Sequence, residues 1–394
     1  MSVTFNNRVP GTKTSVALDI TGFTQSEKVV VLIGHATEAG GNVDPGVVTT
    51  ILNFGDPVKA KTECDTYFGS GSELGEMVVA AINAVVYTDM GSKVFPKIKV
   101  IALEFEDDDL ESLLGDIISV PMPHVASPFP ITDATNLASL KLHLEAISGH
   151  NRGKNGQFGS FGYIASQDEF AVASPLAIAS GTQYLAFPWQ RDTDATKANK
   201  VHEIAAATAI LMAANPVPYN PVNEVRIGKL NAPTLSSDYH TSGDTGTEAL
   251  GLDSGLMPIL TNDAGEALIS RSITSLRTES EAIDSAYYDI QDWQVLYEFR
   301  FNAYLASLKP PFKNKKLSDQ KLLDFKSELL SLAYEFEELE MFQHVKKQAD
   351  QFIARKEAGN RHAGIVATPV NVVPGFHQKG IDITGNNTFD TITL

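Results

Sequence analysis

The sequence has little of three things: cysteine, positive charge and long apolar runs. Its one cysteine, Cys64, cannot form an internal disulfide, and a metal site built from cysteines is excluded. Lys and Arg number 31 against 48 Asp and Glu, which gives a formal net charge of −17. Such a surface repels nucleic acid and anionic lipid. No apolar run approaches the roughly 20 residues that cross a bilayer. We therefore expect no nucleic-acid partner and no direct membrane insertion.

Signatures of catalysis are also missing. Residues 69–75 (GSGSELG) match neither the dinucleotide-binding fingerprint nor the P-loop, the two common phosphate-binding motifs. We therefore interpret them as a tight turn and a helix start. Asp19 and His35 vaguely resemble the Asp and His segments of a subtilisin-type protease, but residues 180–182 do not match its nucleophile segment, and a triad needs all three groups. The acidic run 104–111 lacks the spacing of an EF-hand and reads as a solvated loop. We predict no catalytic residue, no cofactor, no metal ligand and no enzyme.

Apolar strands alternate with amphipathic helices in the first half of the chain. Short apolar runs predict buried strands at 29–34, 98–103, 161–165 and 184–187. Helical spacing of apolar residues predicts helices at 72–86, 134–147, 169–178 and 197–214. This alternation is typical of an α/β layer with a largely parallel sheet.

The second half follows a different pattern. Residues 216–254 are rich in Pro, Gly, Asn, Ser and Thr and read as loop with a short strand at 225–227. Strands at 257–260 and 267–273 flank a hairpin-like turn. Helices are then predicted at 289–308, 318–341 and 344–357, with a β-like stretch from residue 364. We expect a C-terminal α+β region.

Both ends of the chain are polar and extended, with isolated apolar positions that cannot bury themselves. We predict that residues 1–12 and about 376–394 are inter-subunit arms that add strands to other copies. The apolar positions that would make these contacts are Val3, Phe5, Val9, Ile381, Ile383, Phe389 and Ile392. The expected layout is an N-terminal arm at 1–20, an α/β core at 21–285, the α+β region at 286–375 and a C-terminal arm at 376–394.

Several segments resemble the tail sheath family of contractile-tailed bacteriophages, in particular its Mu-like branch. Residues 66–77 (TYFGSGSELGEM) are similar to the family's Phe-Gly-x-Gly-Ser-x-Leu-x-x-Met turn and helix. Residues 255–260 (GLMPIL) and 271–275 (RSITS) resemble its hairpin, and residues 289–300 resemble the helix that opens its C-terminal region. Residues 8–10 (RVP) lie in a similar extended arm. The order and spacing of these motifs run along nearly the whole chain.

The resemblance implies a structural subunit with a subtilisin-like α/β core that lacks a working triad. Such subunits stack as six-fold rings around an inner tail tube and contract to drive the tube through the host cell envelope. The implied partners are further copies, the tube protein, and the baseplate and tail terminator proteins. The resemblance also implies that the subunit is a component of the virion and is assembled in the host cytoplasm. An outward β-rich domain of many relatives looks absent or reduced near 104–131. Two alternatives stay open: the sheath of a non-phage contractile particle, and an α/β hydrolase-like enzyme.

The predicted helix at 344–357 is basic in an otherwise acidic chain. Its apolar stripe would pack on the core, which would leave Lys346, Lys347 and Arg355 toward solvent or a partner. The resemblance places this helix against the inner tube, so these residues are the predicted tube-facing set. A second cluster, Lys313, Lys315 and Lys316, is the runner-up. Ordinary solvated lysines remain the alternative interpretation.

Overall fold

The structure, a computed structural model, describes residues 27–38, 41–91, 93–103, 109–148, 159–191, 198–215, 222–234, 247–276, 289–313, 316–357 and 360–373. The candidate arm residues, Asp19 and Lys315 lie outside these ranges. None of the helices in the described ranges is long and apolar enough to cross a membrane.

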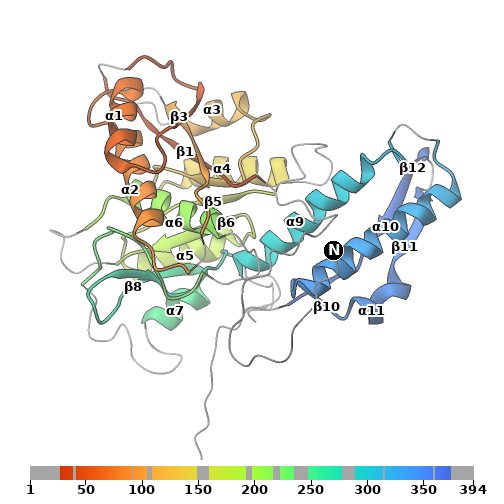
Figure 1. Ribbon diagram of the computed structural model, residues 1–394. Coiled ribbons are helices and arrows are strands. Elements are labelled where there is room, and N and C mark those ends of the chain that lie inside the picture. Colours follow the sequence, from red (N-terminus) through yellow and green to blue (C-terminus); the bar gives the residue numbers. More distant parts are fainter. Residues whose placement is uncertain are drawn as a thin grey trace, which may run out of the picture.

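A nine-stranded sheet forms the centre of the larger body (Figure 1). Its order is β2-β3-β1-β4-β5-β6-β8-β9-β7, and the six strands from β3 to β8 are parallel. Strands β2, β9 and β7 pair antiparallel at the two edges. The predicted α/β layer with a largely parallel sheet is therefore confirmed. The strands are β1 Val29–His35, β2 Val48–Thr50, β3 Lys97–Leu103, β4 His124–Ala126, β5 Phe161–Tyr163, β6 Leu185–Trp189, β7 Val225–Arg226, β8 Leu256–Thr261 and β9 Ala267–Ile269.

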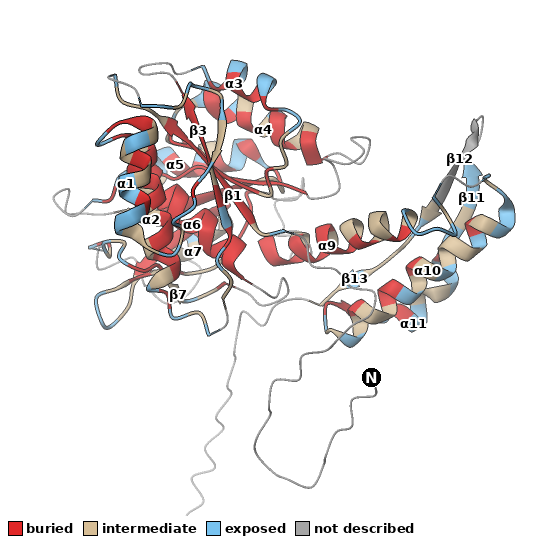
Figure 2. Cartoon of the chain, turned by 45° about the horizontal axis from the view of Figure 1, so that its top comes forward, coloured by how far each residue is buried: buried red, intermediate tan, exposed pale blue. Residues whose placement is uncertain are grey.

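Helices cover both faces of this sheet, as the buried core in Figure 2 shows. Helices α1 (Pro57–Phe68), α2 (Glu73–Val86) and α6 (Val201–Ala214) share one apolar core, and α3 (Leu110–Asp116), α4 (Ala134–Ser148) and α5 (Phe170–Ser180) share the other. Strand β1 alternates between them: Val30 and Leu32 join the first core, and Val31 and Ile33 the second. Burial on both faces explains why β1 is apolar at every position from Val29 to Ile33. Helix α7 (Thr247–Asp253) packs on β8 and α5.

The C-terminal body projects away from the sheet (Figures 1 and 2). Helix α9 (Ile290–Ser307) begins in the core, where Ile290 is buried, and ends in the C-terminal body, where its Phe299 packs on α10 (Asp319–Glu338). The rings of Phe299, Phe336 and Phe342 lie with centroids 5.1 to 5.3 Å apart. The remaining elements are β10 Phe342–Gln343, α11 Val345–Gln348, a 3-10 turn Ala349–Gln351, β11 Ile353–Glu357, β12 Asn360–Ala367 and β13 Asn371–Val372.

The segment predicted as a helix at 344–357 is the clearest error of the sequence analysis. Only the four residues of α11 are α-helical, and β11 pairs antiparallel with β12. Val345 and Phe352 are buried as predicted, but Ile353 is 54 % exposed instead of facing the core. Arg355 therefore lies on a strand and not on one helix with Lys346. The pairing of β11 with β12 overrides the local helical spacing.

Several elements were missed. Residues 104–131 contain α3 and the central strand β4, and α1, α7 and the short strands β2 and β10 were not predicted either. Asp109, assigned to a solvated acidic loop, instead caps α3 by accepting a 2.9 Å hydrogen bond from the Ser112 amide. Strand β4 has three residues, too few to show a period, so it is recognisable only through its partners β1 and β5.

Candidate functional site

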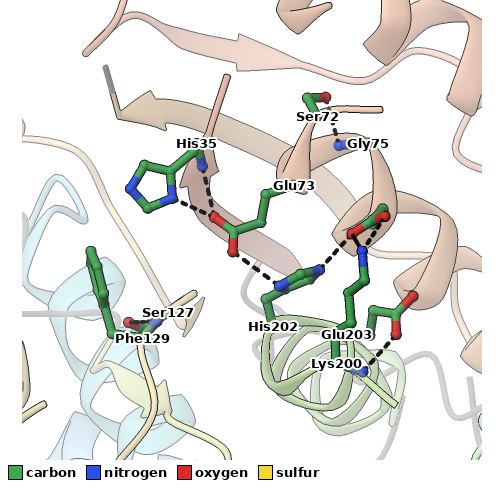
Figure 3. A network of polar contacts seen from close by, with 10 residues as sticks. His35, Ser72, Glu73, Gly75, Ser127, Phe129, Lys200, His202 and Glu203 are labelled. Atoms are coloured by element: carbon green, nitrogen blue, oxygen red, sulfur yellow. Dashed lines mark hydrogen bonds and ion pairs between the residues drawn. The ribbon is translucent and has the colours of Figure 1, made fainter. Parts of the chain in front are cut away.

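A network of charged side chains joins the end of β1 to the first turns of α2 and α6 (Figure 3). Glu73 accepts hydrogen bonds from the His35 amide at 2.9 Å and lies 2.6 Å from His35 Nδ1. Its other oxygen lies 3.0 Å from His202 Nδ1, and His202 Nε2 lies 2.9 Å from Glu76. Lys200 donates to Glu76 at 2.5 and 2.7 Å. The network thus ties one strand of the sheet, β1, to two helices that cover the same face, α2 and α6.

Each carboxylate of this network lies next to a nitrogen donor. Carboxylates only accept hydrogen bonds, so both contacts of His202 are hydrogen bonds when each ring nitrogen carries a proton. Burial raises the pKa of Glu73, but hydrogen bonds from His202 and His35 outweigh burial and hold that pKa well below its usual range. Glu73 and Glu76 also lie in the first turn of α2, where the helix dipole favours negative charge. The network is built to hold the helices in place.

Of the residues that a subtilisin-type protease would use, the two in the described ranges have other partners. His35 is engaged with Glu73, whereas Ser180 ends α5 and donates to the carbonyl of Leu176 at 2.9 Å. Burial raises the pKa of the Cys64 thiol to about 12, which makes it a poor nucleophile. Ser72 caps α2 through the Gly75 amide at 3.1 Å, so residues 69–75 are the turn and helix start that were predicted. The described part of the chain holds no cluster of His, Cys, Asp and Glu that could bind a metal.

Two motifs that the sequence analysis singled out separately meet at the start of α9. The Arg271 guanidinium makes two 3.0 Å contacts with the Asp289 carboxylate, which is 2 % exposed. The Ile290 amide donates to the Ser272 carbonyl at 3.2 Å, and the Ser272 hydroxyl donates to Gln291 at 2.8 Å. Forked Arg–carboxylate pairs fix geometry as well as add energy. The C-terminal body is therefore held rigidly to the core through α9.

The basic residues predicted to face a tube lie on the surface of the C-terminal body. Lys346 and Lys347 are exposed on α11, and Arg355 is exposed on β11. None of the three forms an ion pair with another described residue. Lys356 pairs with Asp319 at 2.9 Å. Of the runner-up cluster, Lys313 and Lys316 are exposed near the start of α10.

The outer face of α5 is apolar although it is open to solvent. The helix (FAVASPLAIAS) contains no charged residue. Val172 and Ile178 are 47 % and 46 % exposed, and Ala171 and Pro175 are exposed with them. A helix that is apolar on all sides is usually covered on all sides.

The chain matches known proteins in structure but not in sequence. No protein-family model matches the chain, and no curated protein sequence matches it. The sheath of an extracellular contractile injection system, the PVC sheath complex in its contracted state, matches with a TM-score of 0.61 and 10% identity, over 98% of this chain and 99% of that chain. The contracted helical sheath of the anti-feeding prophage matches with a TM-score of 0.58 and 16% identity, over 96% and 98%. The sheath tail protein Lin1278 from Listeria innocua matches with a TM-score of 0.59 and 11% identity, over 89% and 93%.

All three neighbours are described as sheath proteins. The likeness covers the α/β body and the C-terminal body together, since nearly the whole of each chain is aligned. The chain therefore has the fold of the sheath proteins of phage-like contractile systems.

Proposed function

We propose that this chain is the sheath subunit of a contractile phage tail. It polymerises as stacked six-fold rings around an inner tube, attaches to baseplate and terminator proteins, and contracts to drive the tube through a cell envelope. The observation that carries the proposal is the alignment of nearly the whole chain with sheath proteins from three systems. The sequence motifs of the tail sheath family, found independently of the fold, support it.

A second candidate is the sheath of a contractile injection particle that is not a phage. It is favoured by two of the neighbours, which come from the anti-feeding prophage and from an extracellular contractile injection system. The sheath subunit would have the same task in both kinds of particle, so the fold does not distinguish a phage from an injection particle. Particles purified from producing cells decide between them, because only a phage carries a head filled with DNA.

The two ribbons of the C-terminal body suit the proposed arms. The pairs β10–β13 and β11–β12 each have two strands, and two-stranded ribbons are marginal in water unless something extends or covers them. Helix α10 covers part of both. Strands added from the arms of neighbouring copies would complete the ribbons with main-chain hydrogen bonds. Such bonds survive rigid-body rotation of the subunits, which contraction requires.

The contact with the inner tube is assigned to Lys346 and Lys347. They are adjacent, exposed and free of ion pairs within the described ranges, on a face of the projecting body. Each exposed ion pair contributes only about 0–1 kcal/mol. A ring of such pairs would hold a tube in register and still release it when the lattice contracts.

The uncharged face of α5 supports dense packing of copies. A chain with a net charge of −17 repels its own copies at long range. Contacts between copies must therefore use surfaces where like charges do not meet, and the outer face of α5 offers one.

Negative-stain microscopy of the purified chain tests the proposal. A sheath subunit forms hollow tubes or long polymerised sheaths without any other protein. A particle-free monomer under all conditions, including high protein concentration and high salt to screen repulsion, would contradict it.

A further inference from the structure

A cavity of about 320 Å³ opens in the C-terminal body between the end of α9, the start of α10 and β12. Phe312 and Phe325 meet edge to face beside it, with ring centroids 5.0 Å apart. Ligand pockets run from roughly 300 to 1,000 Å³, so this one has room for one large side chain and little more. Most of its lining is apolar, from Ala303, Phe312, Leu322, Phe325, Leu329 and Val366.

The rim of this cavity is basic. Lys316 and Lys321 line it, and Lys313 is exposed one residue beyond Phe312. Lys321 donates to Asp324 at 3.2 Å, so part of its charge is compensated. Lys313 and Lys316 form no ion pair with another described residue. An apolar cavity with such a rim fits an aromatic side chain that is followed or preceded by a carboxylate.

The chain itself contains such a segment, Phe389-Asp390. Residues 374–394 carry Asp382 and Asp390 against one lysine, whereas residues 1–26 carry Arg8 and Lys13 against one acid. Charge complementarity with the lysine rim therefore selects the C-terminal segment. Gly385-Asn386-Asn387, a set of turn formers, separates Phe389 from the strand-like pattern at 381–384 and allows the chain to change direction between them.

The positions of the cavity and of the departing chain favour contact between copies. The cavity lies against the first turns of α10, and β13 pairs with β10, which follows the last turn. Helix α10 has 20 residues, which places these ends about 30 Å apart at 1.5 Å per residue. When the cavity belongs to a second copy, this contact is head-to-tail, the type that builds rings or open polymers.

We propose that this cavity is the docking site for Phe389 of a second copy, with Asp390 paired to Lys316. The proposal rests on the proposed function, because it gives the predicted C-terminal arm a specific anchor on its neighbour. It gives Lys316 a role other than contact with the tube.

Disulfide trapping tests the contact in the full chain. Cys64, the one native cysteine, is fully buried, so engineered thiols report alone. One variant carries Thr388→Cys, which keeps Phe389 and Asp390. Its partner carries Ser307→Cys, at the cavity lining, or the control Ser327→Cys, exposed on α10 away from the cavity. Mixing under mild oxidation should give at least tenfold more cross-linked dimer with Ser307→Cys than with Ser327→Cys.

A charge swap tests the specific pair. Asp390→Lys in the first chain should lower the dimer yield about fivefold or more, and Lys316→Asp in the second chain should restore it. Equal yields at both cysteines, or an unchanged yield with Asp390→Lys, would overturn the proposal. Loop closure within a chain carrying both Thr388→Cys and Ser307→Cys, without dimers between mixed chains, would overturn the assignment to a second copy. If the chain forms tubes but no cross-link appears, the docking of Phe389 is refuted and the sheath role stands. If the cross-link appears but the chain forms no tubes, the docking stands and the sheath role is refuted.

Discussion

His124 is a base buried in the middle of the sheet, next to the phenol of Tyr163 at 2.9 Å and stacked on Phe161. Burial, helped by the charge of Lys28, lowers its pKa to about 3. The unfolded chain binds a proton here below about pH 6.5, and the folded chain does so only near pH 3. Stability is therefore lost as the pH falls through this window, by up to about 1.4 kcal/mol per pH unit from this group.

Replacing this base should remove that dependence. We expect His124→Gln to be less stable than the natural chain at pH 7.5 but to lose less free energy of unfolding between pH 6.5 and 5. Urea unfolding at both pH values measures it. Glu73 does not change the free energy of unfolding in this pH range. A carboxylate with a lowered pKa loses its stabilising contribution only below its ordinary pKa of about 4.5. Identical pH slopes in the two proteins would show that His124 is not the source.

The tube contact is a prediction about two residues. Lys346→Glu with Lys347→Glu should leave the melting temperature and self-polymerisation unchanged, because both side chains are exposed. It should abolish ordered assembly on tubes, and wild-type assembly should weaken as salt rises. The control Lys59→Glu with Lys61→Glu makes the same change in net charge on α1. Full-length sheathed tails from the Lys346/Lys347 variant would exclude this contact.

The helices and strands that could be predicted from the sequence are those with an apolar pattern of their own. Strands β1 and β3 and helices α2, α4 and α6 lie close to their predicted ranges, since each has an apolar run or an apolar stripe of its own. Strand β5 has three residues but lies in the apolar run 161–165, whereas the three residues of β4 stand between prolines and belong to no such run. At residues 344–357 the apolar residues have helical spacing, yet the second half of this segment forms β11, which pairs with β12. His35 was noticed, but its partner Glu73, and the His202 and Glu76 side chains that continue the network, come from helix ends that only the fold brings together.

The N-terminal arm gives a prediction about a whole segment. Deleting residues 1–12 should leave a folded chain with an unchanged far-UV spectrum and melting temperature, because these residues are polar with only isolated apolar positions. It should also prevent polymerisation, since we expect strand addition by the arm to supply contacts between copies. Sedimentation and microscopy of the truncated chain measure this. Normal tubes from the truncation would exclude an assembly role for the arm.

Hydrogen exchange tests where the arms dock. Amides of β11 and β13, in two-stranded ribbons, should exchange quickly in the monomer and at least tenfold more slowly in the polymer. Amides of β1, which pairs on both sides with β3 and β4, serve as the internal control and should be protected in both states. Ribbon amides with equal exchange in monomer and polymer would place the arms elsewhere.

The whole molecule consists of a broad α/β body and a projecting body that share helix α9 (Figure 1). The clamp between Arg271 and Asp289 holds the start of this helix to the sheet, and the cluster of Phe299, Phe336 and Phe342 holds its second half to α10. Helix α9 therefore packs on both bodies and is the element that connects them.

Cryo-electron microscopy of the polymer formed by the purified chain shows whether the chain assembles as a sheath. We expect a hollow helical tube with six copies per ring, in which segments from the chain ends of one subunit extend the ribbons of its neighbours. We also expect the projecting bodies to line the inside, with Lys346 and Lys347 toward the lumen. A polymer without six-fold symmetry, or one in which the projecting bodies face outward, would exclude the proposed assembly.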